Sequence, residues 1–304
     1  MKKALTAVLL VFGSGICISG QQTVRRPRET VKQQISRENT ERQQRQERQN
    51  EADRALGMGQ SGLSQVRKNH LLAKVKELYR QPNEEEMKLL APRQEDLDRS
   101  SKFLSVNKNG LIKLLPDRGC ATNPQLVVTS DECLKYSMPG AGSSYSFRKE
   151  THRIQTIADL TLKGDFFLTT GALIQGILVN IGDVPLEEVG GQTEGFAYLA
   201  DFEPETDPFK AREISVKLAD GVKVGDLIYQ SSLPVKENST YLLRSIAYRG
   251  FIQRSYLTLI YDESRWDKRK DVLVAFRVMR RETDGSTTIL WKLLRTKNAP
   301  KMKM

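Results

Sequence analysis

Histidine is almost missing from this chain, since His70 and His152 are the only two among 304 residues. A zinc site with several histidine ligands or a Ser-His-Asp triad would have to recruit one of them. The motifs Gly-x-Ser-x-Gly and His-Glu-x-x-His are absent as well. We interpret His70 as an exposed helix residue and His152 as a strand-edge residue. A mechanism that uses carboxylates alone, as in glycosidases, stays open.

Cysteine is also scarce, and the spacing of Cys17, Cys120 and Cys133 excludes a Cys-x-x-Cys redox or metal motif. Cys120 and Cys133 flank a segment with Asn123 and Pro124, residues that favour a turn. We therefore predict a disulfide between Cys120 and Cys133, which would contribute on the order of 3 kcal/mol by restricting the unfolded chain.

The sequence has no apolar run long enough for a transmembrane helix. Its N-terminus instead has Lys2 and Lys3, a short apolar run at 4–12 and then small residues. This layout predicts a cleavable signal peptide at 1–20, with Cys17 and Ser19 at the spacing that signal peptidase prefers. A lipid anchor on Cys17 is the less favoured alternative, because bulky Ile16 precedes it. We expect a periplasmic or secreted protein.

The net charge of +11 is concentrated near the two ends of the chain. Residues 265–304 contain twelve Lys and Arg against four Asp and Glu. In an exported protein, such basic ends favour an anionic envelope polymer, a lipid surface or an envelope protein as partner, and no nucleic acid is expected. A solvated surface that maintains solubility is the plainer interpretation.

Residues 21–60 are dominated by Gln, Arg, Glu and Asn, with too few apolar side chains to form a core. This composition predicts a disordered basic tether. The segment 57–62 fits the Gly-x-Gly-x-x-Gly spacing of dinucleotide sites, but no buried strand precedes it, so we interpret it as a flexible joint.

A helical region is predicted at 61–103. Leu71, Leu72 and Val75 recur at helical spacing, and Pro82 ends this helix. Asn83 followed by Glu86 has the form of a capping box that begins a second helix. A role for the apolar stripe in binding a partner is the alternative to packing on the next domain.

Residues 104–296 are predicted to form a mainly antiparallel β domain, a sandwich or open barrel, with a basic tail at 297–304. We expect hairpins at 160–168, at 214–224 and at 272–293, where Asp284 and Gly285 provide the turn. Further strands are expected at 196–199, 241–248 and 256–261. The fold class is thus α+β, with short N-terminal helices before the β domain.

Two weaker patterns could indicate an activated serine or a calcium site. Ser105 with Lys108, and Ser146 with Lys149, fit the Ser-x-x-Lys spacing in which a lysine activates a serine, but Lys-Thr-Gly is absent. The alternating acids at 201–207 offer oxygen ligands for Ca²⁺, yet the sequence departs from an EF-hand where Thr206 replaces the turn glycine. We predict no metal site and no cofactor.

The best candidate contact surface mixes aromatic and arginine side chains, which can stack on sugars or pair with anions. Ordinary packing in a sheet is the competing explanation. The candidate ligand contacts are Tyr241, Arg244, Tyr248, Arg249, Tyr256, Tyr261 and Trp266. We therefore expect a non-enzymatic binding or structural module of the cell envelope, with a carboxylate-dependent hydrolase of envelope glycans as the alternative.

Overall fold

The computed structural model describes residues 64–117 and 138–303, which all lie within one compact unit, residues 52–304. The predicted signal peptide, the tether, the joint at 57–62 and all three cysteines lie outside the described residues. The predicted disulfide between Cys120 and Cys133 therefore stays a prediction.

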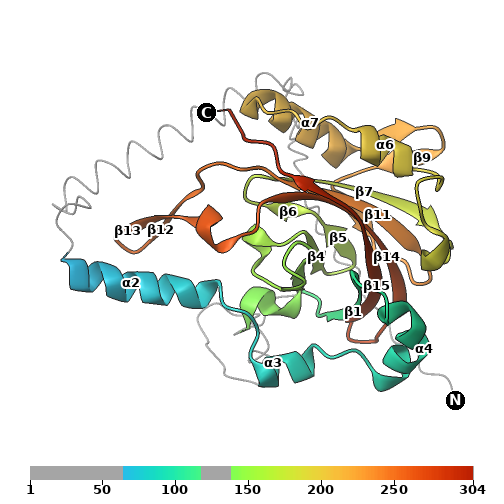
Figure 1. Ribbon diagram of the computed structural model, residues 1–304, viewed down its shortest axis with the longest axis horizontal. Helices are drawn as coiled ribbons and strands as arrows, with labels where there is room; N and C mark the ends of the chain where they lie inside the picture. Colours follow the sequence, from blue (N-terminus) through green and yellow to red (C-terminus); the bar gives the residue numbers. More distant parts are fainter. Residues whose placement is uncertain (1–63, 118–137, 304) are drawn as a thin grey trace, which may run out of the picture. The chain divides into compact units, whose positions relative to one another are not determined.

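Short helices come first in the described chain, as predicted (Figure 1). The helix with Leu71 and Val75 on its buried side ends before Pro82, and the next one begins at the predicted capping box. The α-helices are α2 (Gln65–Leu78), α3 (Glu84–Leu89), α4 (Gln94–Leu104), α6 (Phe196–Asp201) and α7 (Pro208–Asp220). The 3₁₀ helices are η3 (Pro139–Gly142), η4 (Gln155–Ile157), η5 (Leu186–Glu188) and η6 (Glu263–Trp266).

The capping box of α3 supplies a first test of the fold. The Asn83 side chain accepts a hydrogen bond from the Glu86 backbone N–H at 2.9 Å, and the Glu86 carboxylate accepts one from the Asn83 N–H at 2.8 Å. Replacing Asn83 with alanine should lower the free energy of unfolding by about 1 kcal/mol, because the N–H of Glu86 loses its acceptor. Urea titration checks this value, and Asn83→Ser should retain most of the stability.

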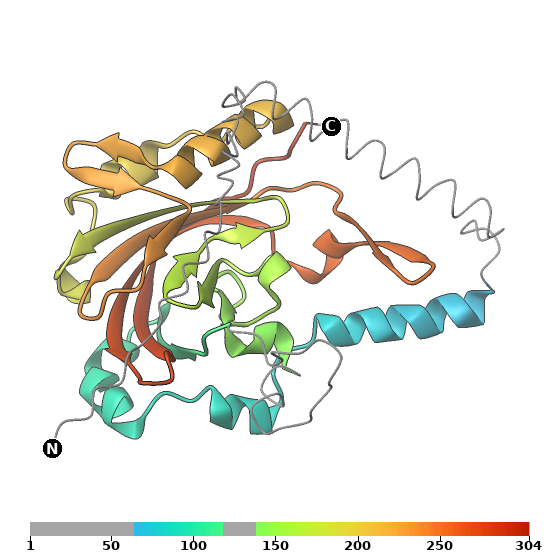
Figure 2. The same ribbon diagram turned by 180° about the vertical axis from the view of Figure 1, so that it is seen from behind.

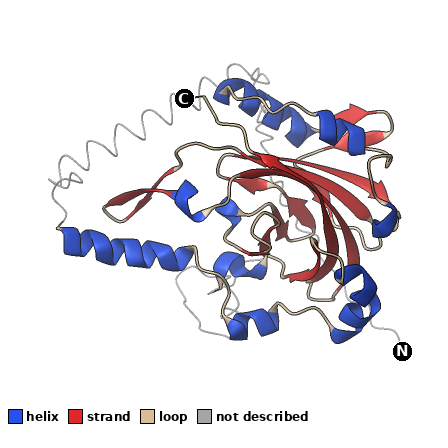
Figure 3. Ribbon diagram, in the orientation of Figure 1, coloured by secondary structure: helices blue, strands red, loops and turns tan. Residues whose placement is uncertain are grey.

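Two antiparallel sheets form the body of the domain (Figure 3). The larger has the strand order β1-β15-β14-β11-β7-β6, and the smaller β10-β5-β4-β2-β3. The larger sheet comprises β1 (Asn109–Leu114), β6 (Thr170–Gly171), β7 (Ile174–Gly182), β11 (Thr240–Ala247), β14 (Lys270–Arg281) and β15 (Thr287–Asn298). The smaller comprises β2 (Ser144–Ser146), β3 (Thr151–His152), β4 (Leu160–Lys163), β5 (Phe166–Leu168) and β10 (Ser232–Pro234). Two separate hairpins are β8 (Val222–Val224) with β9 (Leu227–Tyr229), and β12 (Gln253–Tyr256) with β13 (Leu259–Asp262).

The larger sheet curves around the smaller one and is covered on its other face by α6 and α7 (Figure 2). One core lies between the sheets and contains Phe167, Tyr241 and Phe276. A second core contains Leu242 of β11 together with Leu199 and Leu218 of the helices. Because successive residues of a strand point to opposite faces, β11 is buried on both of them.

The hairpins predicted at 160–168 and 272–293 are confirmed as β4–β5 and β14–β15. The strand expected at 241–248 corresponds to β11. The single strand expected at 256–261 is wrong, because this segment contains the last residue of β12, the two-residue turn and the start of β13.

Two further predicted strands are wrong, because residues 196–199 and 214–218 belong to α6 and α7. The hairpin predicted at 214–224 is therefore wrong as well, and its second strand, β8, pairs with β9 instead. Asp207 caps α7 by accepting the N–H groups of Phe209 and Lys210, and Pro208 occupies the first turn. Ile214 and Leu218 are four residues apart, a spacing that fits a helix face as well as alternation in a strand. The local sequence is therefore compatible with a helix and with a strand, and the N-terminal cap at Asp207 favours the helix.

Candidate functional site

Three of the predicted contact residues are buried in β11 or directly after its end. Tyr241 is fully buried and Arg244 and Tyr248 are 2% exposed, which leaves them no surface to contact a ligand in this structure. The Tyr241 hydroxyl donates to the carbonyl of Pro234 at 2.8 Å, and that of Tyr248 donates to Oε1 of Gln175 at 2.9 Å. These residues hold strands and loops together.

Arg244 forms a buried ion pair with Asp271, in which its Nε and Nη2 donate at 3.0 and 2.7 Å to the two carboxylate oxygens. Its Nη1 donates to the carbonyl of Leu199 at 2.7 Å. This arginine ties α6 to the sheet. Arg249 is engaged with the C-terminal segment, since its Nε donates to the carbonyl of Ala299 at 2.8 Å.

The remaining three predicted contacts come together at another place. Tyr256, Tyr261 and Trp266 pack in one cluster with Tyr79 from the end of α2. Tyr79 stacks on Trp266 with ring centroids 4.9 Å apart, and Tyr261 meets Trp266 edge-on at 5.4 Å. The aromatic cluster thus joins α2 to the β12–β13 hairpin. We refer to α2 and this hairpin together as the arm (Figure 1).

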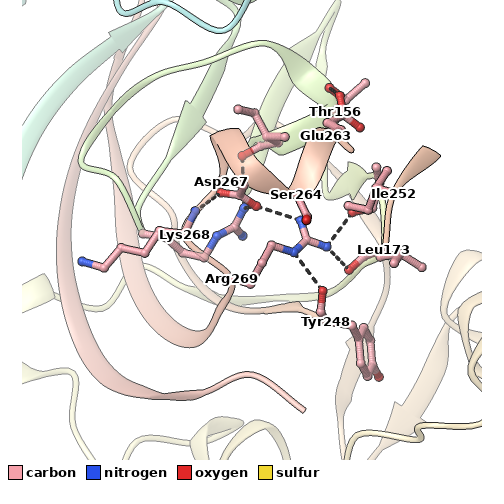
Figure 4. A network of polar contacts seen from close by, with 12 residues as sticks. Thr156, Leu173, Tyr248, Ile252, Glu263, Ser264, Asp267, Lys268 and Arg269 are labelled. Atoms are coloured by element: carbon pink, nitrogen blue, oxygen red, sulfur yellow. Dashed lines mark hydrogen bonds and ion pairs between the residues drawn. The ribbon is translucent and has the colours of Figure 1, made fainter. Parts of the chain in front are cut away.

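Two carboxylates on the segment of η6 connect the arm to the body (Figure 4). The first, Glu263, is 1% exposed. Its carboxylate accepts hydrogen bonds from the hydroxyls of Tyr79 at 2.8 Å and Thr156 at 2.7 Å, and from Nε of Arg254 at 2.8 Å. Burial raises the pKa of the Tyr79 hydroxyl, and its hydrogen bonds to Tyr261 and Glu263 raise it further, so it stays a neutral donor.

The second carboxylate, Asp267, is completely buried and bridges two arginines. It accepts from Nη2 of Arg148 at 3.0 Å and from Nη1 of Arg269 at 2.7 Å, and the backbone N–H of Lys268 donates to it at 2.7 Å. Arg148 also pairs with the buried carboxylate of Asp159. The result is a sealed network of alternating charges in which each carboxylate has at least one cation beside it.

Burial has opposite effects on the two kinds of charge in this network. It raises the pKa of the Asp159 carboxyl, while Arg148 and a hydrogen bond from Ser245 oppose that change. It lowers the pKa of the Arg269 guanidinium, with Asp267 in opposition. Desolvation thus disfavours both charged forms, and their mutual attraction offsets part of that cost.

Among the described residues, every buried carboxylate has an arginine partner, which is the pattern of structural ion pairs. A general acid or base needs a carboxylate that can take up or release its proton beside a substrate. In these six pairs, an arginine guanidinium lies beside the carboxylate where a substrate would have to bind. The pairs are Glu86–Arg80, Asp96–Arg280, Asp159–Arg148, Glu263–Arg254, Asp267–Arg269 and Asp271–Arg244.

The Ser-x-x-Lys candidates do not show activated serines. Ser146 donates weakly to Asp159 at 3.3 Å, and Ser105 donates to the carbonyl of Lys102 at 2.7 Å. Lys108 forms an ion pair with Glu150 at 2.6 Å. Burial and neighbouring cations lower the pKa of Lys149, but no hydrogen bond between its ammonium and the Ser146 hydroxyl exists in the structure.

Two of the acidic residues at 201–207 form hydrogen bonds within the fold. Asp207 caps α7, and Glu205 accepts the Asp207 N–H at 2.8 Å. Within the part of the chain that the structure describes, no group of three or more His, Cys, Asp and Glu side chains could hold a metal ion.

His152 is buried to 3% exposure, and its Nδ1 has no hydrogen-bond partner. Burial lowers its pKa from 6.5 to about 4. The unfolded chain therefore binds more protons between these two values, and stability should be complete above pH 6.5 and fall toward pH 4. Lowering the pH from 7.5 to 5 should reduce the free energy of unfolding by about 2 kcal/mol through the protonation of His152 in the unfolded chain.

Urea titrations of the wild type and His152→Gln at both pH values check this contribution. The pH-dependent loss should be about 2 kcal/mol smaller in the variant. Equal losses in the two proteins would contradict the assignment.

Sequence reasoning missed the network of Arg148, Asp159 and Asp267. One signal was present, because Asp159 is a lone acid between the apolar residues Ala158 and Leu160. A charge in such a place is seldom buried without a partner. Its partner could not be read from the sequence, since Arg148 and Asp267 approach it from different segments.

Within residues 64–117 and 138–303, each helix is too short or too polar to span a bilayer. No protein-family model, no curated protein and no solved structure matches the chain.

Proposed function

We propose that this is an exported protein of the cell envelope whose folded part is a non-enzymatic binding or structural module. The observation that carries the proposal is the pairing of every described buried carboxylate with an arginine. Such acids stabilise the fold and leave little for acid–base chemistry. Export is inferred from the N-terminal 20 residues, which have the form of a signal peptide.

A carboxylate-dependent hydrolase of envelope glycans is the second candidate. The raised pKa of Asp159 favours it, because a glycosidase needs one carboxylic acid that stays protonated. Against it, the Asp159 side chain is completely buried and is held by Arg148 and Ser245.

The partner should carry negative charge, because the basic residues are concentrated toward the chain ends. An anionic envelope polymer, a lipid surface or an envelope protein would each fit. Binding of the purified mature protein to envelope fractions should be strong at low salt and weak at high salt. Absence of binding in both conditions would contradict the proposal.

The same envelope fractions test whether the protein is a hydrolase. Release of soluble glycan fragments by the wild type, and its loss in Asp159→Asn with folding retained, would replace the binding proposal with the enzymatic one. We expect no release above the level of a buffer control.

A further inference from the structure

The arm has an unusual end. Its hairpin pairs Tyr256 with Leu259, so Leu257 and Thr258 are the two residues of the turn. Leu257 has φ +52°, while Thr258 is not among the residues with positive φ. Two-residue turns of this kind place glycine at the first position, because a side chain is strained there. A bulky leucine in such a conformation calls for a functional explanation.

This leucine is also exposed. Its fractional exposure is 78%, and that of Val66 is 80%, the two highest values for large apolar side chains in the described residues. Val66 is the second residue of α2. The first turn of α2 and the turn of the β12–β13 hairpin lie at the same end of the arm, directed away from the two sheets (Figures 1 and 2).

The surroundings of this end are basic. Arg67 and Lys68 near the start of α2 are exposed, and the exposed Lys74 and Lys76 follow toward its other end, where Glu77 is the one acidic residue of the helix. No carboxylate of the described residues forms an ion pair with these four cations. Residues 65–70 are exposed on every side of the helix. The arm thus presents apolar side chains beside positive charge that the described fold does not neutralise.

The packing of α2 fixes this arrangement. Leu71 and Val75 form a core with Leu259, the residue that follows the hairpin turn. Glu263 then holds Tyr79 at the end of the helix. The helix is therefore joined to the hairpin from Leu71 onward, and its exposed start and the hairpin turn can approach one surface together.

From this geometry we propose that the end of the arm binds anionic lipid bilayers, with Leu257 inserted among the lipids and the basic residues of α2 on their headgroups. Apolar insertion and attraction to anionic lipid act together in peripheral membrane proteins. The inference rests on the proposed binding function and specifies its partner. A soluble acidic polymer offers no apolar phase, so it would give the exposed leucine no role.

The test uses the mature full chain with vesicles of phosphatidylcholine alone or with one third phosphatidylglycerol. We expect binding to the anionic vesicles only, weakened by NaCl. Leu257→Gly should bind about tenfold more weakly, because an apolar side chain leaves the bilayer. Its melting temperature should stay within about 3 °C of the wild type, since glycine accepts the positive φ.

Two further variants separate the apolar from the charged contribution. Val106→Gly removes another apolar side chain, 57% exposed in a different loop, and should bind as the wild type does. Arg67→Gln with Lys68→Gln should bind about twenty-five-fold more weakly at low salt, since each cation near an anionic surface contributes roughly fivefold.

Insertion can be seen directly with Leu257→Trp and vesicles that contain brominated lipid. Quenching beyond that of the wild type, which reports Trp266 and Trp291, is expected. Equal binding by wild type and Leu257→Gly, or no added quenching in Leu257→Trp, would overturn the inference. Salt-sensitive binding to envelope fractions that survived in Leu257→Gly would leave the proposed function standing with a soluble polymer or a protein as partner.

Discussion

Replacing Asp267 with asparagine should lower the free energy of unfolding by about 3–5 kcal/mol, because two buried arginines lose the charge between them. Asparagine keeps the shape of the side chain but cannot compensate the guanidinium groups of Arg148 and Arg269. The total free energy of unfolding of native proteins is only about 5–15 kcal/mol, so a urea titration should show the loss clearly.

Asp220→Asn is the matched control for Asp267→Asn. Asp220 is exposed at the end of α7, and the same chemical change there should stay within about 0.5 kcal/mol of the wild type. A loss below about 1 kcal/mol in Asp267→Asn would show that the network contributes little, and the description of η6 as the link between arm and body would be wrong.

The second large effect is expected at adjacent phenylalanines of β5. Phe167 is fully buried between the sheets, with its ring 5.2 Å from Phe276 and 5.4 Å from Tyr241, centroid to centroid. Phe167→Ala should cost about 3–5 kcal/mol through lost burial and the cavity that remains. Phe166 is 49% exposed, and Phe166→Ala should cost less than about 1 kcal/mol.

Denaturation of the two alanine variants measures which face of β5 the core occupies. Because alternate residues of a strand point to opposite faces, similar losses in both would contradict the register of β5 with β4 and β10.

Much of the fold follows from local patterns. The hairpin of β14 and β15 was predictable because Val272, Val274 and Phe276 alternate before a turn at Gly285, and tertiary packing preserves that alternation. The start of α3 was predictable because Asn83 and Glu86 satisfy each other within four residues. In both cases the local signal and the final packing agree.

The predictions at 196–199 and 214–218 were wrong for a physical reason. A short apolar segment such as Ile214 to Leu218 fits the spacing of a strand and of a helix, and the choice depends on what covers it. Here α6 and α7 cover the outer face of the larger sheet, which placed Leu199 and Leu218 in its second core. Asp207 followed by Pro208 was the local sign of a helix start.

The predicted contact surface shows the same limit. Tyr241 and Tyr256 are both aromatic residues of strands, but β11 is covered on two faces while the β12–β13 hairpin lies in the arm. Sequence periodicity does not tell which strands acquire a second covering layer. The exposure of Leu257 and its positive φ are likewise properties of the folded turn.

Peptide mapping of the protein recovered from its native cells tests most directly whether it works outside the cytoplasm. We expect a mature N-terminus at Gly20 or Gln21 and a peptide in which Cys120 and Cys133 are joined under non-reducing conditions. An acylated N-terminal Cys17 would still mean export, with a lipid anchor. Retention of Met1 with both later thiols free would contradict export, and nucleic acid would then become the expected partner of the basic ends.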